Sequence, residues 1–388
     1  MRIWHKGLDG IHAFYMNGLL RSLFMSLTRI FVPIFIYSLN ESLIEVVIYF
    51  IVHRVIVVIV AFPVSKLIEK IGFRRSIAIS VLSLMVSTIS LYFAKDNFYF
   101  LYLAVLGESL QVPIYWISRD SALSQDVGDK VMGKSIGYLT ALENIASLLG
   151  PFVGGVIILF LGYQSLFAVA FVILTLSLLP LWNMHGHTHK NGVSIRGFWY
   201  FLTNGRYLHQ VVANFGASMN DYGNGVIWPL MLMLASITDA RLGAIYSITA
   251  VAAIVVNYVA GPWFDKLRNR KDYADEGVYG FATIWLVASW IFRFFANGFG
   301  QVVSIDIGRQ IMGSVHGNFF ADYMHLGGKR MSSIAFWVYM EIVYSFGAIT
   351  LFSIMLLGIY LDIWKELVIG TIALWSLATI VMARESNL

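Results

Sequence analysis

Apolar stretches of roughly 20 residues recur from one end of this sequence to the other, and each is long enough to cross the ~30 Å hydrocarbon core of a bilayer as a helix. Hydrophobic residues make up 58% of the 388 residues and charged residues only 13%, with a mean hydropathy of +0.73. Soluble domains carry about a quarter charged residues. The composition therefore excludes a set of soluble domains and predicts an all-α integral membrane protein.

Hydrophobic runs, separated by turn residues and charges, predict twelve transmembrane spans. They lie near residues 10–39, 42–64, 75–95, 98–118, 131–160, 164–183, 207–235, 241–262, 278–297, 300–321, 331–358 and 364–383. The longest polar interval lies between the sixth and seventh spans. We therefore expect an N-terminal six-helix bundle (1–184), a cytoplasmic linker (185–206) and a C-terminal six-helix bundle (207–388). The first span is too long for the apolar core of a secretory signal and lacks a small-residue cleavage site, so we expect it to be retained.

The basic residues cluster in alternate loops, while the intervening loops hold only Lys95, Arg241 and Lys365. The clusters are Arg2 and Lys6; Lys66, Lys70, Arg74 and Arg75; Lys130 and Lys134; Lys190, Arg196 and Arg206; Lys266, Arg268, Arg270 and Lys271; Lys329 and Arg330; and Arg384. Cytoplasmic loops of membrane proteins carry this excess of Lys and Arg. The pattern predicts that both termini are cytoplasmic, and we expect the protein in the plasma (inner) membrane.

The two predicted bundles repeat each other in sequence. The second span ends in residues 65–75 (SKLIEKIGFRR), and the eighth ends in residues 261–271 (GPWFDKLRNRK). Glu143 and Glu341 occupy matching places in spans 5 and 11. Many secondary transporters are built from such parallel repeats, with the substrate site near the bilayer midplane between them.

Two motifs resemble those of the major facilitator superfamily. The loop after span 2 resembles its G-x-x-x-D-[RK]-x-G-[RK]-[RK] signature, with Ser65 and Glu69 replacing the first glycine and the acid, and with Phe73 inserted. The second-half copy keeps Gly261, Asp265 and Lys266. Span 5 resembles the G-x8-G-x3-G-P-x2-G-G motif of the superfamily's antiporters, at Gly137, Ala146, Gly150, Pro151, Gly154 and Gly155. The resemblance covers the whole chain, is strongest to the drug/proton antiporter branch, and implies the major facilitator fold.

The resemblance also implies a cytoplasmic latch between the two bundles. Glu69 would dock near the start of span 11 and Asp265 near the start of span 5, where the helix dipole favours negative charge. Asp120 would then pair with Arg74 and Arg75. In the second half, Asp322 would pair with Arg268 and Arg270. The alternative is that these are interfacial charges that only set topology. The glycines of span 5 have two explanations as well, antiport or close helix packing.

Ionisable residues at membrane depth are the strongest candidates for function, because burying a charge is costly and such groups face cavities or pair with one another. Counting along each predicted helix places Arg21, Arg54, Glu108, Glu143, Arg309 and Glu341 near the midplane, and Asp221 somewhat beyond it. Two aromatic residues are further candidates, because Tyr115 lies on the same span as Glu108 and Trp228 lies on the same span as Asp221. The acids could carry protons, or they could form static ion pairs. We favour Glu108 and Asp221 for proton coupling, and expect Glu143 and Glu341 to brace the bundle.

Together these features predict a secondary transporter that works by alternating access and couples the export of an organic or amphipathic solute to protons. An importer of a small anionic metabolite is the alternative within transport. An intramembrane enzyme or a transport-inactive receptor is the alternative of another class, but no nucleophile or metal constellation is visible. We expect the partners to be the bilayer, a small-molecule or lipid-like solute and protons. We expect no nucleic acid, cofactor or metal, and a monomer.

Two patterns suggest other chemistry but lack its context. Residues 128–135 match the P-loop pattern, which requires a strand before it and a helix after it. The alternating His185, His187 and His189 could bind a divalent metal, but such a tract is more often a solvated loop. The absence of cysteine excludes disulfides and thiolate metal sites.

Overall fold

The computed structural model describes residues 2–126, 129–183, 192–269, 274–296, 298–328 and 333–380. Within these ranges the secondary structure is entirely helical, as the composition predicts. The histidine tract lies outside the described residues. Several helices are described without side-chain detail, among them the stretch that carries Glu143 and the stretches that carry Asp265, Arg268 and Asp322.

The N-terminal half contains the first six predicted spans, two of which depart from a simple helix. Span 1 consists of two helices separated by a three-residue turn at 29–31, and Pro33 lies in the first turn of the second helix. Spans 5 and 6 form one element with a sharp kink at Gly162, where φ is +78°, a conformation that glycine adopts readily. The helices are α1 (Arg2–Thr28), α2 (Val32–Asn40), α3 (Leu43–Ile71), α4 (Phe73–Phe93), α5 (Tyr99–Asp126) and α6 (Asp129–Leu178), and a 3-10 turn follows at Leu179–Asn183.

The C-terminal half contains the other six predicted spans, and its first span is interrupted by a π-helical turn at Gly223–Ile227. The helices are α8 (Gly205–Tyr222), α9 (Trp228–Leu234), α10 (Asp239–Asn269), α11 (Ala274–Phe294), α12 (Phe299–Gly328), α13 (Ser333–Tyr360) and α14 (Trp364–Ala378). π-Helical turns are rare and occur frequently at functional sites.

The predicted linker contains a short amphipathic helix, α7 (Ile195–Thr203). Ser194 caps its first turn by accepting a hydrogen bond from the Gly197 amide at 3.0 Å. Its buried residues Phe198 and Phe201 pack against Tyr339 of α13, and Phe198 also meets Phe62 of α3. The linker helix is therefore packed against both halves.

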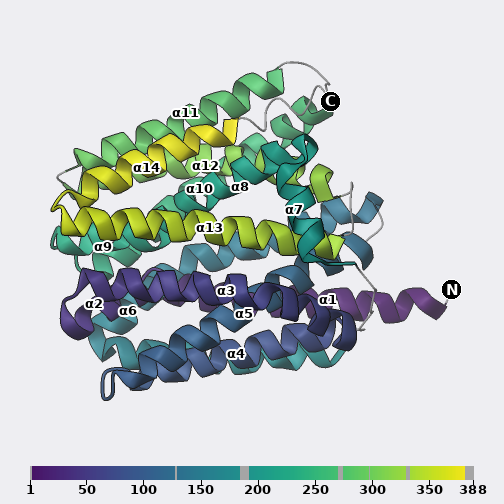
Figure 1. Cartoon of the computed structure of the whole chain (residues 1–388), viewed down its shortest axis with the longest axis horizontal. Helices are drawn as coiled ribbons and strands as arrows, with labels where there is room; N and C mark the ends of the chain where they lie inside the picture. Colours follow the sequence, from purple (N-terminus) through teal and green to yellow (C-terminus); the bar gives the residue numbers. More distant parts are fainter. Residues whose placement is uncertain are drawn as a thin grey trace.

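The helices run side by side along the length of the molecule, and both ends of the chain lie at the same end of the bundle (Figure 1). We call this the termini end, and the other the loop end. The two halves meet mainly through two helix pairs, α6 with α10 and α3 with α13. In the predicted repeat, span 5 corresponds to span 11 and span 2 to span 8. The two pairs are therefore equivalent under exchange of the halves, which is the pseudo-symmetry expected of the fold.

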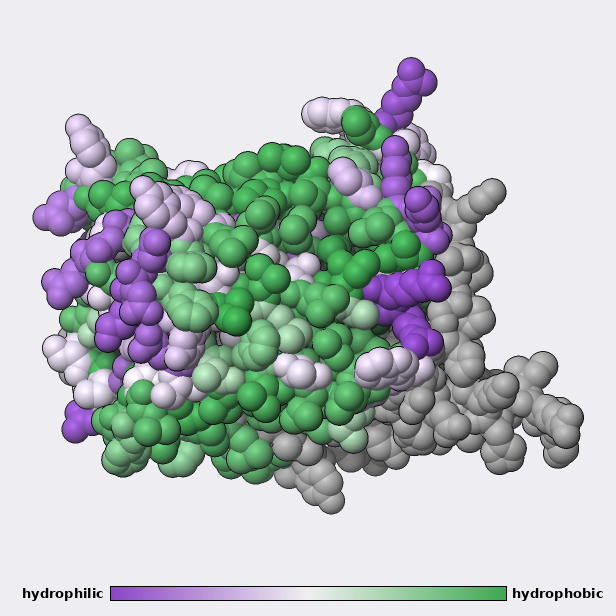
Figure 2. Space-filling model, turned by 90° about the horizontal axis from the view of Figure 1, so that it is seen from below, coloured by the Kyte–Doolittle hydropathy of each residue, from purple (hydrophilic) through white to green (hydrophobic). Residues whose placement is uncertain are grey.

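The surface has the banded character of an integral membrane protein. In the view of Figure 2, a broad apolar belt separates hydrophilic residues at the two ends of the molecule. Among the described residues, seven helices are long and apolar enough to cross a membrane. The segments are Tyr15–Asn40, Leu43–Ile71, Phe73–Phe93, Tyr99–Ser121, Leu148–Trp182, Gly277–Phe294 and Ile334–Tyr360. Other predicted spans are interrupted, as in α8 and α9, or short, as in the 15-residue α14.

Candidate functional site

A cavity of about 380 Å³ lies between the two halves, a size within the usual range for small-molecule sites. Residues of α1, α3, α4, α5 and α6 line it from the first half, and residues of α8 and α13 line it from the second. Much of its wall is apolar, and the ionisable groups facing it are Arg29, His53, Arg54, Glu108, Asp120, Asp221 and Glu341. Of the ionisable residues that the sequence places at membrane depth, the structure therefore brings together Arg54, Glu108, Asp221 and Glu341 around one cavity.

The strongest polar contact across the cavity joins α3 to α13. The guanidinium of Arg54 donates to Glu341 at 2.7 Å and to the Ser345 hydroxyl at 3.3 Å. Its Nε also donates to the Tyr222 hydroxyl, and its charge lies 5.1 Å from the centre of the Tyr344 ring. Arg54 is therefore held by three elements, α3, α8 and α13. Because this pair links the two halves, it constrains their relative position as well as neutralising two buried charges.

Two further carboxyl groups of the cavity, Glu108 and Asp221, are held by tyrosines instead of cations. The Tyr49 hydroxyl of α3 donates to Glu108 at 2.7 Å, and the Tyr344 hydroxyl of α13 donates to Asp221 at 2.9 Å. Among the described residues, neither carboxyl has a cationic partner within 4.0 Å. A neutral donor leaves a carboxyl group free to gain or lose a proton without breaking an ion pair. Glu108 and Asp221 therefore differ chemically from Glu341.

Arg29 is a cation that lines the cavity but was not among the residues placed near the membrane midplane by counting along the predicted helices. It lies in the turn that separates α1 from α2, and its side chain is exposed to the cavity. The guanidinium packs against the backbone of Gly225, where an added Cβ would lie 2.9 Å from Nε. A glycine in the π-helical turn thus allows the cation of span 1 to lie against span 7. Arg29 lines the same cavity as Glu108 and Asp221.

Arg21 and Tyr115 form a separate buried group within the first half. The Arg21 guanidinium lies 3.5 Å from the centre of the Tyr115 ring and donates a hydrogen bond to Gln111. Arg21 is 3% exposed and does not line the cavity, whereas Gln111 does. Its Nη1 atom is buried without a hydrogen-bond partner among the described residues. Arg21 therefore lies behind the cavity wall, where it positions Gln111.

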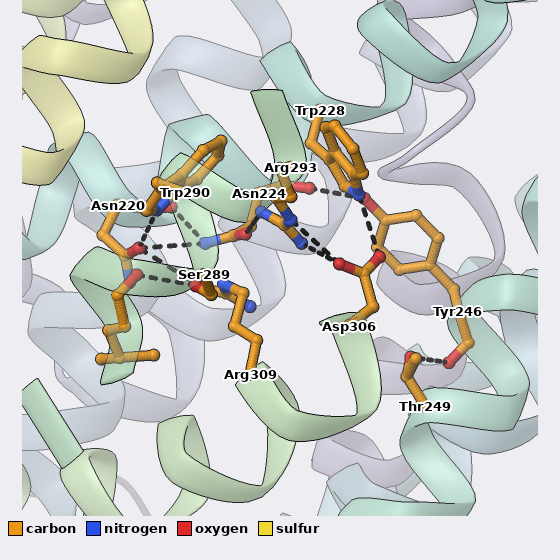
Figure 3. Close-up of polar contacts among 11 residues, drawn as sticks. Asn220, Asn224, Trp228, Tyr246, Thr249, Ser289, Trp290, Arg293, Asp306 and Arg309 are labelled. Atoms are coloured by element: carbon orange, nitrogen blue, oxygen red, sulfur yellow. Dashed lines mark hydrogen bonds and ion pairs between the residues drawn. The ribbon is translucent and has the colours of Figure 1, made fainter. Parts of the chain in front are cut away.

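A second polar network lies within the C-terminal half (Figure 3). Its centre is the ion pair between Arg293 of α11 and Asp306 of α12, at 2.7 Å, with both side chains less than 10% exposed. Trp228 donates to Asp306 at 2.9 Å, and Asn224 accepts from Arg293 at 2.6 Å. The Arg293 guanidinium lies 4.4 Å and 4.6 Å from the ring centres of Trp228 and Trp290.

This network holds the π-helical turn in place, and it includes two of the predicted site residues. Trp228 follows the turn and contacts Asp306, whereas Arg309 donates to Asn220 at 3.4 Å. Neither lines the central cavity. Sequence reasoning missed Arg293 and Asp306. The signal that could have found them is that both are ionisable residues inside neighbouring predicted spans, where such residues tend to pair.

The latch residues are partly described. Asp120 lies 3.7 Å from Arg119 of its own helix and faces the central cavity. Arg74 and Arg75 instead line a different pocket near the end of α6. The side chains of Asp265, Arg268 and Asp322 lie outside the described residues, as does Arg270. The latch therefore stays a prediction.

The glycines of span 5 allow α6 to contact two helices at once. Gly150 and Gly154 pack against α1; a Cβ at Gly154 would lie 2.6 Å from the Leu27 carbonyl oxygen. Gly155 packs against the start of α10, where a Cβ would lie 2.7 Å from the Asp239 carbonyl oxygen. Ala146, which replaces the motif glycine, accepts a hydrogen bond from Ser26 at 2.7 Å through its carbonyl. Close packing accounts for these small residues, and Gly155 places the motif at the junction between the halves.

Comparisons with known proteins agree with this architecture. The family model of the Major Facilitator Superfamily matches residues 14–202. No curated protein matches the sequence. Among solved structures, an outward conformation of the superfamily transporter FucP superposes with a TM-score of 0.71 at 11% identity, covering 99% of this chain and 100% of that one. A mutant of the peptide transporter POT gives 0.69 at 14% identity, covering 97% and 94%. The chain is thus an integral membrane protein with the major facilitator fold, and its residues 14–202 match the model of that superfamily.

Proposed function

We propose that the protein is a proton-coupled secondary transporter that moves an organic solute by alternating access. The observation that carries the proposal is the central cavity, which is lined from both halves and contains two carboxyl groups that, among the described residues, are held by tyrosines and not by cations. A solute bound there contacts both halves. Its entry and exit therefore require the halves to separate first at one end and then at the other.

The chemistry of Glu108 and Asp221 supports proton coupling. Removal from water disfavours the charged form of a carboxyl group, and a nearby cation favours it. Arg29 lies against span 7 across the junction between the halves, so a change in their relative position alters its distance from Asp221. A carboxyl group whose cationic neighbour moves between two states takes up a proton in one and releases it in the other.

The cavity wall suits an amphipathic solute. Aromatic and aliphatic side chains from both halves line it together with a small number of polar groups, an arrangement typical of small-molecule sites. The apolar residues include Phe24, Phe50, Leu84, Trp116, Phe167, Val226 and Trp337. We assign export as the direction because of the resemblance of span 5 to the antiporter motif.

An importer of a small anionic metabolite is the second candidate, and Arg29 is the observation that favours it. This cation faces the cavity and, among the described residues, forms no ion pair or hydrogen bond through its side chain. The two candidates differ in the expected effect of Arg29→Gln. An importer of anions should lose solute binding, whereas an exporter of amphipathic solutes should keep it.

Spin labels can test alternating access and proton coupling without a known solute, because the chain contains no cysteine. One label pair replaces Lys70 and Arg206 at the termini end, and another replaces Asp96 and Asp362 at the loop end; all four are exposed. After reconstitution, a change from alkaline to acidic buffer should lengthen one distance and shorten the other. Glu108→Gln or Asp221→Asn should abolish this response, since an amide cannot ionise.

Glu45→Gln is the matched control, because Glu45 lies at the loop end outside the cavity and contacts Asn40. It should leave the response intact. If both distances move in the same direction, or if neither cavity variant alters the response, the coupling mechanism proposed here is wrong.

A further inference from the structure

A second pocket, of about 640 Å³, lies at the termini end and is separate from the central cavity. It is formed where α3 ends, α4 begins and the chain leaves α6. Basic side chains form one part of it, and apolar side chains form the rest. The residues that line it are Lys70, Ile71, Arg74, Arg75, Ala78, Leu82, Leu178, Leu181 and Trp182.

The three basic side chains have no acidic partner among the described residues. Lys70 lies in the last turn of α3, and Arg74 and Arg75 lie in the first turn of α4. Within the part of the chain that the structure describes, none of the three forms an ion pair or a side-chain hydrogen bond. Cations in the first turn of a helix are also opposed by its dipole. An anion in this pocket would therefore be stabilised by three cations.

The apolar part of the pocket continues onto the outer surface of α4. Leu82 is 50% exposed, and Val86, Ile89 and Phe93 follow it at helical spacing as further exposed apolar side chains. This stripe extends from the basic cluster toward the loop end over 12 residues, about 16 Å of helix. Trp182, 71% exposed, borders the pocket. Tryptophan is enriched where protein surface passes from hydrocarbon to headgroup.

The combination of a positive cluster and an adjoining apolar stripe matches an anionic phospholipid. A soluble anion would use the cations but not the stripe, and a neutral lipid would use the stripe but not the cations. Basic pockets between transmembrane helices bind anionic headgroups in this way. We propose that this pocket binds an anionic phospholipid, with its phosphate between Arg74, Arg75 and Lys70 and an acyl chain along the Leu82–Phe93 stripe.

Lipid retention by the purified full-length protein tests the assignment. The protein is mixed with equal amounts of phosphatidylglycerol and phosphatidylcholine of matched acyl chains, and the bound lipid is measured by native mass spectrometry. The unmodified chain should retain phosphatidylglycerol preferentially. Each basic group near an anionic lipid is worth roughly a fivefold change in binding, so Arg74→Gln/Arg75→Gln should weaken this retention about 25-fold.

The matched control is Arg196→Gln/Arg206→Gln, which removes two exposed basic residues from the termini end outside the pocket. It should keep the preference. Leu82→Asn should weaken retention of both lipids if the stripe holds an acyl chain. Where the double arginine variant fails to fold, Arg75→Gln alone replaces it, because Arg75 is exposed.

Equal losses in the pocket and control variants would show general surface attraction and overturn the assignment. Unchanged retention in the Arg74 and Arg75 variants would overturn it as well. Thermal stabilisation by inorganic phosphate equal to that by phosphatidylglycerol would indicate a soluble anion in place of a lipid. None of these results depends on the transport activity of the central cavity.

Discussion

At the scale of single residues, the two buried ion pairs have different positions and hence different consequences. Arg54 and Glu341 come from different halves, whereas Arg293 and Asp306 belong to adjacent helices of one half. Breaking a buried pair by removing one partner strands the other charge and costs about 3–5 kcal/mol. Loss of the second pair should therefore act on folding, and loss of the first should also act on how the halves are arranged.

Replacing Arg293 with Met tests this distinction. Among the described residues, the substitution leaves Asp306 as a buried charge with Trp228 as its remaining hydrogen-bond partner, so the melting temperature should fall clearly. Replacing both partners, Arg293→Met/Asp306→Leu, should recover most of the loss, since no stranded charge remains. The measurement is thermal unfolding of the purified variants in detergent. A double variant as unstable as the single one would mean that Asn224 and the π-helical turn also require the arginine itself.

Depth along the sequence predicted part of the site at this scale. It identified Arg54, Glu108, Asp221 and Glu341, but it placed Arg21 at the midplane of a cavity that the residue does not reach. Arg29 was missed because depth was counted along an unbroken first span, whereas the helix stops at Thr28. The tyrosines that hold Glu108 and Asp221 come from other helices. A single sequence does not tell which residues of two distant helices face each other, so these contacts could not be predicted.

At the scale of helices, small residues decide how closely the elements approach. α6 contacts α1 and α10 through glycines at positions where any side chain meets backbone. Close packing was one of the two explanations that the sequence offered for the small residues of span 5, which recur every four positions. Which helices pack against α6 could not be predicted, because these small residues identify one face of α6 but not the helices that contact it.

A pair of glycine substitutions separates packing from helix propensity. Gly155→Ala places a methyl group against the Asp239 carbonyl, so it should destabilise the protein or force α10 away from α6. Gly370→Ala lies in α14, where a Cβ meets nothing within 4 Å. It should be neutral or stabilising, because alanine is favoured over glycine in helices by roughly 1 kcal/mol. Melting temperatures that fall equally in both variants would exclude the packing explanation.

At the scale of the whole molecule, the order of the spans and the pairing of the halves agree with the sequence. Each of the twelve predicted spans corresponds to a described helix, to part of one or, for spans 1 and 7, to two helices in succession. The boundaries of the two bundles and of the linker stay predictions. The sequence did not reveal that the linker contains α7, because its nine residues are too few for periodicity to be distinguished from a polar loop.

Cysteine labelling in intact cells tests the orientation predicted from the loop charges. Single cysteines at Lys70 and Arg206 should react only after the membrane is made permeable, because the termini end is predicted to be cytoplasmic. Single cysteines at Asp96 and Asp362 should react in intact cells with a reagent that cannot cross the membrane. Labelling of all four positions from one side would be incompatible with the predicted topology.

The linker helix α7 has a mechanical consequence for the proposed cycle. Phe198 contacts α3 of one half and α13 of the other, and the Tyr339 hydroxyl of α13 donates to the Ser194 carbonyl at 2.9 Å. Separation of the halves at the termini end would pull Phe198 away from Phe62 while α7 remains tied to α13. The segment between the bundles would then stay bound to the second half. Exposure of the apolar surface of Phe62 to water would contribute to the free energy needed to open that end.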